Sequence, residues 1–490
     1  MTAAPHVSPD GARADRRRLA LTLLVAGTFF MENLDGTILA TAAPTIGRAY
    51  GVGSAAVGLA ITAYLVTLAV LIPVSGWLTG RLGARTVFTS AIAVFTIASV
   101  LCALSTDLAE LTVMRVIQGA GGALMVPVGR LAVLRVTEKK DLVAAIAWLT
   151  WPALAAPIVA PLLGGLLVTF ASWQWIFLLN VPLGVVAFVA ALRLTPPETE
   201  RDSAPLDVLG FVLTFVGVGG VVVFGALLAD PGASVVAVIV AGAAGALLTA
   251  GAIVHLLRAP HPLLDLRAFR VETFRVTHAG GSLFRLTISA VPFLLPLFFQ
   301  DALGWSPVQA GAVVLALFVG NLAIKPATTP FLVRWGFRRV LIGSTAGAVL
   351  SMVLCAFVSG LTPVVLIVVL LVFSGMARST GFTAYNTIAF ADIPSEELTP
   401  ANTLASTVQQ IAAGLGIAVG AVALRAGTAF AGGADTTTAY QVAFLIIAVL
   451  ALGSVVEAVR LSPGAGENIR PPRRERRARR GGVTAPSEPR

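Results

Sequence analysis

Two stretches, GRLGARTVF at 80–88 and VRWGFRRVL at 333–341, decide how this chain is organised. They align without gaps, so that Gly83 corresponds to Gly336 and each glycine is flanked by arginines. Each stretch also separates two long apolar runs. Because the same polar turn recurs in the same setting, the sequence indicates a duplicated structural unit.

The composition is that of a membrane protein. Of the 490 residues, 57% are hydrophobic and only 12% are charged, whereas soluble proteins carry about 25% charged residues. An α-helix needs roughly 20 apolar residues to cross a bilayer, and about fourteen runs meet that criterion. The expected spans are 19–43, 55–78, 87–105, 108–134, 143–168, 175–193, 206–228, 235–257, 276–299, 308–332, 338–358, 362–391, 401–425 and 439–460.

Positive charge alternates between the two sides of these spans. The chain has 34 Lys and Arg against 24 Asp and Glu, a net charge of +10. One set of loops holds most of the arginines, among them Arg81, Arg193 and Arg267, whereas the opposite set holds little beyond Arg48. The positive-inside rule therefore places both termini in the cytoplasm. The basic residues Arg16–Arg18, followed by a long apolar run, predict a first transmembrane helix rather than a cleavable signal peptide.

The position of the repeated turn divides the chain. If a six-helix unit is duplicated, the second copy begins with span 276–299, and the spans between 206 and 257 are an insertion. We therefore expect an all-α polytopic membrane protein with helices arranged as six plus two plus six. The expected parts are a cytoplasmic tail 1–18, an N-terminal half 19–193, two inserted helices 206–257, a C-terminal half 276–460 and a basic, disordered cytoplasmic tail 461–490.

Four segments resemble the major facilitator superfamily, and within it the fourteen-span drug:proton antiporter branch of EmrB- and QacA-like proteins. They are LDGTILATAAP at 34–44, GWLTGRLGAR at 76–85, RVIQGAGGALMVPVGR at 115–130, and PIVAPLLGG at 157–165 with SWQWIFLLNVPLG after it. In order, they are similar to the acidic first-helix motif, the signature loop, the proton-relay motif and the antiporter motif. The amino-acid sequence of spans four to six most resembles that of the bacterial MdtD-like subgroup. The resemblance covers nearly the whole chain and implies the major facilitator fold and solute export in exchange for protons.

Two positions depart from the family pattern. The signature loop normally has an acid where this chain has Gly80, which puts in doubt the usual salt-bridge control of the gate. The antiporter motif normally reads Gly-Pro, whereas this chain has Ala160 before Pro161. The second change is mild, since alanine is also small.

Charged residues inside the first half point to proton coupling. A charge in a membrane helix costs about 2.5–3.5 kcal/mol on insertion scales, so it usually faces a cavity or a partner. Glu32 and Asp35 are three residues apart and share a helical face. Asp35 and Arg115 each lie roughly 10–12 Å from the outer ends of their spans, so they can pair. Together with the resemblance, this predicts that Asp35 or Glu32 carries the proton and that Arg115 tunes its affinity; the alternative is a structural ion pair.

The fifth span is expected to act as a hinge between the halves. Pro157 and Pro161 each remove a backbone donor and bend the helix, while Gly164 and Gly165 permit close approach of a neighbouring helix. An ordinary kinked membrane helix is the alternative.

The signature loop is expected to act as a cytoplasmic gating latch. Its candidate residues are Gly76, Arg81, Gly83 and Arg85. The repetition of the loop in the second half favours this role, and a simple positive anchor is the alternative.

The second half places cations inside spans that contain no acid in their cores. Arg285 and Arg378 fall near the middle of their spans and are expected to line the substrate cavity. Lys325 lies in the inner third of its span, where it either lines the cavity or extends to the membrane surface. Asn386 and Gln409 are expected to add hydrogen bonds, with packing roles as the alternative.

Several function classes are excluded. No lysine follows the glycine pattern of an ATP-binding loop, and the four histidines show no metal-ligand spacing. The loops are too short for a catalytic constellation, which argues against an enzyme, and the prolines and the internal repeat argue against a channel. We expect no metal and no cofactor, with the proton gradient as the energy source.

The leading expectation is a proton-coupled antiporter in the bacterial inner membrane that exports small amphipathic compounds, including drugs. Its partners would be those compounds, protons and the lipid bilayer, with no nucleic acid, and it would act as a monomer. The alternative is a more selective exporter of an anionic metabolite or a metal chelate.

Cysteine labelling in intact cells tests the topology. Residues introduced in the Arg470–Arg480 tail and the Arg267–Arg275 loop should be accessible from the cytoplasm, and those in the Asp230–Ser234 turn from outside. A twelve-span protein would place these sites on inconsistent sides, and the inserted pair would then be ruled out.

Overall fold

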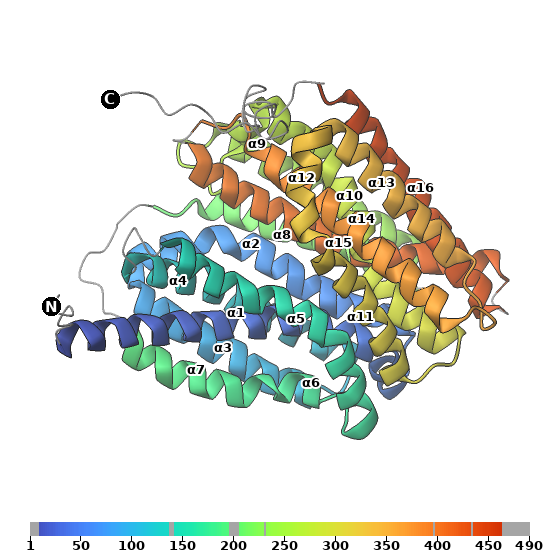
Figure 1. Ribbon diagram of the computed structural model, residues 1–490, viewed down its shortest axis with the longest axis horizontal. Coiled ribbons are helices and arrows are strands. Elements are labelled where there is room, and N and C mark those ends of the chain that lie inside the picture. The colour runs from blue at the N-terminus through green and yellow to red at the C-terminus, as the bar shows by residue number, and fades with distance from the viewer. Residues whose placement is uncertain are drawn as a thin grey trace, which may run out of the picture.

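The computed structural model describes residues 9–136, 142–195, 205–229, 232–394, 397–432 and 435–462. Within these ranges the chain is helical and contains no strand. The helices run side by side in one bundle, and the start of α1 and the end of α16 lie at the same end of it (Figure 1). The elements are α1 Pro9–Tyr50, η1 Ser54–Val57, α2 Gly58–Leu82, α3 Ala84–Leu104, α4 Leu108–Val136, α5 Leu142–Phe170, α6 Trp175–Leu178, α7 Asn180–Leu194, α8 Val208–Ala229, α9 Val235–Arg258, η3 Leu266–Arg270, α10 Glu272–Leu297, η4 Phe298–Ala302, α11 Pro307–Ala323, α12 Lys325–Trp335, α13 Phe337–Ala356, α14 Val364–Ala389, α15 Leu398–Phe430 and α16 Thr436–Arg460.

The expected all-helical membrane fold is confirmed. Thirteen helical segments among the described residues are long and apolar enough to cross a membrane. Helix α5, with a shorter apolar stretch at Ala155–Phe170, corresponds to the remaining expected span. Helix α1 begins at Pro9, within the expected tail 1–18, because the helix continues beyond the apolar run through alanines and arginines that favour helix.

Two expected spans are broken by prolines. The span 308–332 consists of α11 and α12, which meet at Ile324 just before Lys325 and Pro326. A proline lacks the backbone donor and clashes with the preceding turn, so the helix restarts there. The span 175–193 consists of α6 and α7, with Pro182 in the first turn of α7.

The repeated turn has the same backbone conformation in both halves. Gly83 ends α2 and precedes α3 with φ 85° and ψ 146°, and Gly336 ends α12 and precedes α13 with φ 82° and ψ 160°. Residues with a Cβ rarely adopt this region. The duplication seen in the sequence is therefore a duplication of local structure.

The two inserted helices pack on each other and on both halves. A Cβ at Gly220 of α8 would lie 2.8 Å from Gly245 Cα of α9, so the absence of side chains lets these helices approach closely. On its other side α8 contacts α2 and α15, and Arg425 of α15 donates a hydrogen bond to the Leu228 carbonyl of α8. The buried members of the apolar contact with α2 are valines, namely Val66, Val70, Val218 and Val222, and Leu59, Phe211 and Phe215 pack against them.

The two halves meet in the half of the bundle away from the termini, here called the distal half. Thr62 of α2 donates to the Gly414 carbonyl of α15 at 3.1 Å, and Gln300 of η4 donates to the Thr41 carbonyl of α1 at 3.0 Å. Figure 1 shows the first-half helices, blue to green, on one side and the second-half helices, yellow to red, on the other.

Some expectations concern residues outside the described ranges. The tail beyond residue 462, including Arg470–Arg480, is one of them, as are residues 1–8 and Asp230 of the expected outer turn. The domain limits given above stay predictions.

Substituting alanine for Gly83 or Gly336 should lower the thermal stability of the purified protein. Each change places a Cβ in a strained backbone region, which costs about 1–3 kcal/mol. Gly343→Ala in α13 is the matched control, because it lies in a helix with nothing within 4 Å of a new Cβ and should be neutral or slightly stabilising. An unchanged melting temperature for Gly83→Ala and Gly336→Ala would show that the turn tolerates side chains.

Candidate functional site

The acid and the arginine that the sequence places at one depth meet in the structure. Arg115 of α4 donates a hydrogen bond to Oδ2 of Asp35 on α1, and both side chains are buried. The other carboxylate oxygen, Oδ1, accepts from Gln118 Nε2 at 2.9 Å and from Asn180 Nδ2 at 2.8 Å. Gln118 also donates to Ser99 Oγ at 2.8 Å. One guanidinium and two amides therefore surround the Asp35 carboxylate.

The local sequence explains how these groups converge. Arg115 and Gln118 are three residues apart on α4, so they share a face, and Arg115 Nη1 donates to Gln118 Oε1 at 2.7 Å. Asn180 is the first residue of α7, which starts afresh after the short helix α6. The side-chain amide of Asn180, just after this break, is the group that reaches Asp35.

Aromatic rings hold the guanidinium from its other side. The Arg115 Cζ atom lies 3.9 Å from the centroid of the Tyr64 ring and 5.8 Å from that of Phe177. A desolvated cation over an aromatic face gains about 2 kcal/mol. Nε and Nη2 of Arg115 have no hydrogen-bond partner among the described residues. Two guanidinium nitrogens, with three N–H groups between them, are therefore unused while the ion pair is closed.

Glu32 has a different environment from Asp35, although both lie on α1. It is half-buried, and its Oε2 accepts a hydrogen bond from Asn33 Nδ2 at 3.1 Å. Glu32 forms no ion pair with any described residue. A Cβ at Gly122 of α4 would lie 3.6 Å from Glu32 Cγ and 3.3 Å from the Tyr64 hydroxyl oxygen. Glu32 and the unpaired Tyr64 hydroxyl thus border the same small gap.

Two cations that the sequence places in the second half, Arg285 and Lys325, form hydrogen bonds with uncharged groups. Arg285 of α10 donates to Asn386 Oδ1 of α14 at 2.8 Å and to the Thr277 carbonyl at 3.1 Å. Lys325 at the start of α12 donates to Thr383 Oγ1 of α14 at 3.0 Å. In the described part of the chain, neither cation forms an ion pair with a carboxylate.

Arg378 and Gln409, the remaining candidates for the substrate cavity, are both half-buried. Arg378 lies on α14, and its buried Nε has no partner within the described ranges. Gln409 lies on α15. The structure brings Arg285 and Asn386 together but does not join Gln409 to them by a hydrogen bond among the described residues.

His278 adds a buried polar group next to this region. It stacks on Phe274 with ring centroids 4.1 Å apart, and its Nδ1 lies 3.0 Å from the Phe274 carbonyl oxygen. Its Nε2 has no partner in the part of the chain that the structure describes. No group of three or more metal-binding side chains occurs among those residues.

The family assignment follows from comparison with known proteins. The family model described as Major Facilitator Superfamily matches residues 25–256 and 277–488. The chain belongs to the major facilitator superfamily. It is therefore a multi-pass membrane transporter and not an enzyme.

Curated relatives from this superfamily are similar over most of their length. A protein of Escherichia fergusonii, provisionally named multidrug resistance protein MdtD, is 36% identical over 404 residues, covering 82% of this chain and 85% of the relative. The protein of the same name from Serratia proteamaculans is 37% identical over 401 residues, covering 81% and 83%. The predicted resemblance to the MdtD-like subgroup is confirmed.

Solved structures of other superfamily members share the fold. A mutant of the nucleoside transporter NupG matches with a TM-score of 0.64 at 16% identity, covering 91% of this chain and 98% of that one. An auto-inhibited POT family peptide transporter matches with a TM-score of 0.65 at 14% identity, covering 90% and 97%. A bacterial homologue of the human lysosomal transporter Spinster, in an inward-facing conformation, has a TM-score of 0.59 at 16% identity, covering 91% and 99%.

The antiporter-motif residues of this superfamily member lie between the two halves. A Cβ at Gly164 of α5 would meet Ile38 of α1, and a Cβ at Gly165 would lie 2.5 Å from the Pro307 carbonyl oxygen of α11. The Pro161 carbonyl group faces Gly311 of α11. Pro157 lies half-buried one turn earlier in the helix. Close backbone packing of α5 on α1 and α11 therefore depends on these glycines.

The candidate gating-loop residues contact their own half. Arg81 lies 5.5 Å from the centroid of the Trp77 ring, and Arg85 donates to the Leu192 carbonyl of α7. Gly76 is exposed on α2. The Arg85 contact ties the start of α3 to the end of α7, and the latch role stays a prediction.

A separate cavity of about 1100 Å³ lies in the distal half, between η1, α2, α8, α15 and α16. Its walls are mostly apolar, with Asp301, Arg425 and Asp435 at polar positions. None of the candidate site residues from the sequence lines this cavity.

Sequence reasoning missed several members of the Asp35 network. Gln118 and Asn180 both stand within the quoted motifs, and Ser99 and Tyr64 lie in apolar spans without a motif. The signal for Gln118 was available, because an amide three residues from a buried arginine shares its face. Asn180 could be recognised only as a polar residue within an apolar run, and nothing in the sequence links it to Asp35.

Proposed function

We propose that this transporter is a proton-coupled exporter of small amphipathic compounds that works by alternating access. The observation that carries the proposal is the pair of inequivalent carboxylates on α1. Asp35 is closed in an ion pair with Arg115, whereas Glu32, one turn earlier, has no cation among the described residues. The relatives named for multidrug resistance support export of drug-like compounds.

Asp35 and Arg115 would couple a proton to a rearrangement. While Asp35 is charged, the ion pair compensates both buried groups. A proton on Asp35 would leave the Arg115 guanidinium buried without a counter-charge, and breaking a buried pair in this way costs about 3–5 kcal/mol. Proton binding therefore favours a conformation in which Arg115 gains another partner or water. The two unused nitrogens of Arg115, Nε and Nη2, are available for that partner.

Proton and substrate would compete for binding to the Glu32 carboxylate. A carboxylate without a cation in a membrane helix is costly, and either a proton or a positively charged substrate group removes that cost. Because both ligands relieve the same charge, only one of them binds at a time. Such competition is the basis of antiport.

The packing of the halves suggests the direction of access. The cross-half contacts described above, including Thr62 with Gly414 and Gly165 with Pro307, lie in the distal half. This arrangement supports a state open toward the end that carries the termini. With the loop arginines as a guide, we propose that this end faces the cytoplasm of a bacterial inner membrane. We further propose that the protein works as a monomer, without a metal or cofactor, on the proton gradient alone.

Coupling can be tested by replacing the two carboxylates separately. In proteoliposomes, Asp35→Asn should abolish substrate-dependent proton movement, and Glu32→Gln should weaken the dependence of substrate binding on pH. The exposed Glu272→Gln at the start of α10 is the control and should behave like the unmodified protein. Wild-type transport with an unchanged pH dependence in both Asp35→Asn and Glu32→Gln would overturn the proposal.

A second candidate is selective export of an anionic compound, such as a carboxylate metabolite or a chelate. It is favoured by one observation: Arg285, Lys325 and Arg378 lie within the second half without a carboxylate partner among the described residues. An unpaired buried charge is costly. An acidic substrate group would supply the counter-charge directly.

Arg378→Gln distinguishes the two candidates. If anions are substrates, this change should weaken their binding roughly tenfold or more, as expected for a lost hydrogen bond to a charged group, while neutral compounds bind as before. Arg378→Lys keeps the charge and should restore part of the loss. Direct binding measurements that show dications preferred, with Arg378→Gln harmless to every anion tested, would favour cationic-drug efflux.

A further inference from the structure

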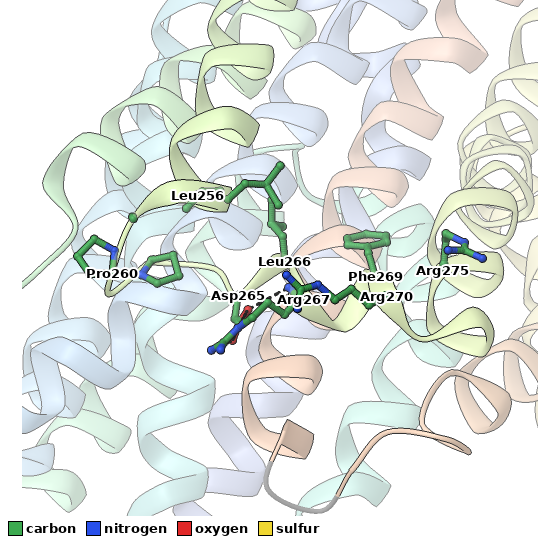
Figure 2. A pocket seen from close by; sticks show the side chains of 11 residues that line it. Leu256, Pro260, Asp265, Leu266, Arg267, Phe269, Arg270 and Arg275 are labelled. Carbon is green, nitrogen blue, oxygen red and sulfur yellow. Dashed lines mark hydrogen bonds and ion pairs between the residues drawn. The ribbon is translucent and has the colours of Figure 1, made fainter.

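A pocket lies where the second inserted helix joins the second half. It has a volume of about 430 Å³ and is formed by the end of α9, the following loop, η3 and the start of α10. Figure 2 shows Leu256, Leu266 and Phe269 with Arg267, Arg270 and Arg275 around it. The pocket belongs to neither the Asp35 network nor the second-half cations.

The pocket carries uncompensated positive charge. Arg267 is balanced by Asp265, with Nη2 to Oδ2 at 2.7 Å and Nε to Oδ1 at 3.0 Å. Arg270 and Arg275 are exposed, and neither forms an ion pair with a described residue. Three guanidinium groups and one carboxylate line the pocket, so it carries a net positive charge, even though Arg270 lies near enough to Asp265 to add to the Arg267 hydrogen bond in lowering the pKa of that carboxyl group. Guanidinium groups bind phosphate oxygens in pairs of parallel hydrogen bonds.

The pocket also lies at the edge of the membrane-facing surface. Helix α9 is one of the apolar helices able to cross the bilayer, and most of it is exposed in the bundle. Near its end the apolar residues Ile253, Val254 and Leu257 are 47%, 46% and 64% exposed. An acyl chain can cover this face while its headgroup occupies the pocket. A free phosphate ion would leave the apolar face unused.

The loop that shapes the pocket is held in place by Asp207 at the start of α8. Its Oδ1 lies 2.7 Å from His255 Nε2, and its Oδ2 accepts from the Leu263 amide at 3.1 Å. Burial alone would raise the pKa of Asp207, but hydrogen bonds from the Gly210 and Leu263 amides and from His255 hold that pKa below its ordinary value. Asp207 is therefore charged at neutral pH, and the loop stays attached to the inserted pair.

The apolar residues beneath the pocket connect it to the second half. Leu256, Leu264 and Phe274 form a buried cluster with Ile393, which follows α14, and Leu404 of α15. A ligand in the pocket would therefore lie next to a cluster that joins the ends of α10, α14 and α15. Its occupancy can affect how these helices move.

We propose that this pocket binds the phosphate headgroup of an anionic phospholipid from the leaflet at the terminal end of the bundle, with an acyl chain along α9. Arg270 and Arg275, which lie apart from each other in the pocket (Figure 2), supply the positive charge that attracts the phosphate, and the exposed face around Leu257 holds the chain. Basic pockets between transmembrane helices are suited to such headgroups.

The full-length protein in detergent can be tested with short-chain phosphatidylglycerol, phosphatidylcholine of the same chain length, and inorganic phosphate, with binding followed by native mass spectrometry. Phosphatidylglycerol should bind roughly tenfold or more tightly than phosphatidylcholine, as expected for two arginines near an anionic group. Arg270→Gln with Arg275→Gln should remove this preference, and Arg270→Lys with Arg275→Lys should keep part of it.

The matched control is Arg193→Gln with Arg339→Gln, which removes two exposed arginines without an ion pair to a described residue from the same end of the bundle, outside the pocket. It should leave the preference intact, whereas Leu257→Ser should weaken phosphatidylglycerol binding without removing an arginine. Equal losses in the control and the pocket variant would show that only general surface charge is sensed. Inorganic phosphate that binds as tightly as the lipid would identify an ion site instead, and either result would overturn the proposal.

Discussion

The ion pair between Asp35 and Arg115 is the constraint around which the first half is built. Two charges at this depth of a membrane protein are tolerated only if each is compensated. The compensation requires α1 and α4 to lie side by side, α3 to supply Ser99, and α7 to begin at Asn180. The carboxylate thus joins α1, α4 and α7 directly, and Ser99 ties α3 to the same network through Gln118 and Asn180. A change at Asp35 therefore affects both the packing of this half and its charge balance.

The contact between the halves rests on a different principle, namely the absence of side chains. Gly165 of α5 faces the Pro307 carbonyl of α11, and Gly311 faces the Pro161 carbonyl in return. Backbones this close gain van der Waals contact without forming directional bonds that would have to be broken when the halves separate. The cross-half hydrogen bond from Thr62 to the Gly414 carbonyl joins a different pair of helices, α2 and α15. Such an interface can close tightly and still reopen.

The sequence predicted the parts of the molecule that depend on composition and local geometry. The apolar runs, the duplicated turn at Gly83 and Gly336 and the possibility of an Asp35–Arg115 pair all follow from length, spacing or depth. It could not separate the environments of Asp35 and Glu32, because the difference comes from helices that are distant in sequence. Asn180 reaches Asp35 only because α7 packs beside α1, and no local sequence pattern predicts that contact. Asn386 was expected to add a hydrogen bond in the second half, but its pairing with Arg285 depends on how α10 and α14 pack and could not be predicted from the sequence.

The attachment of α8 has a consequence for any rocking motion of the halves. Its Leu228 carbonyl accepts a hydrogen bond from Arg425 of the second half, while toward α2 it presents apolar side chains, with Phe211 and Phe215 packed beside Val218 and Val222. A hydrogen bond to a charged group resists separation, whereas apolar surfaces can slide with little loss of contact. The inserted helices would then move together with the second half, and their apolar face would slide along α2 of the first half. Lipids that contact the inserted helices would then have to rearrange in each transport cycle.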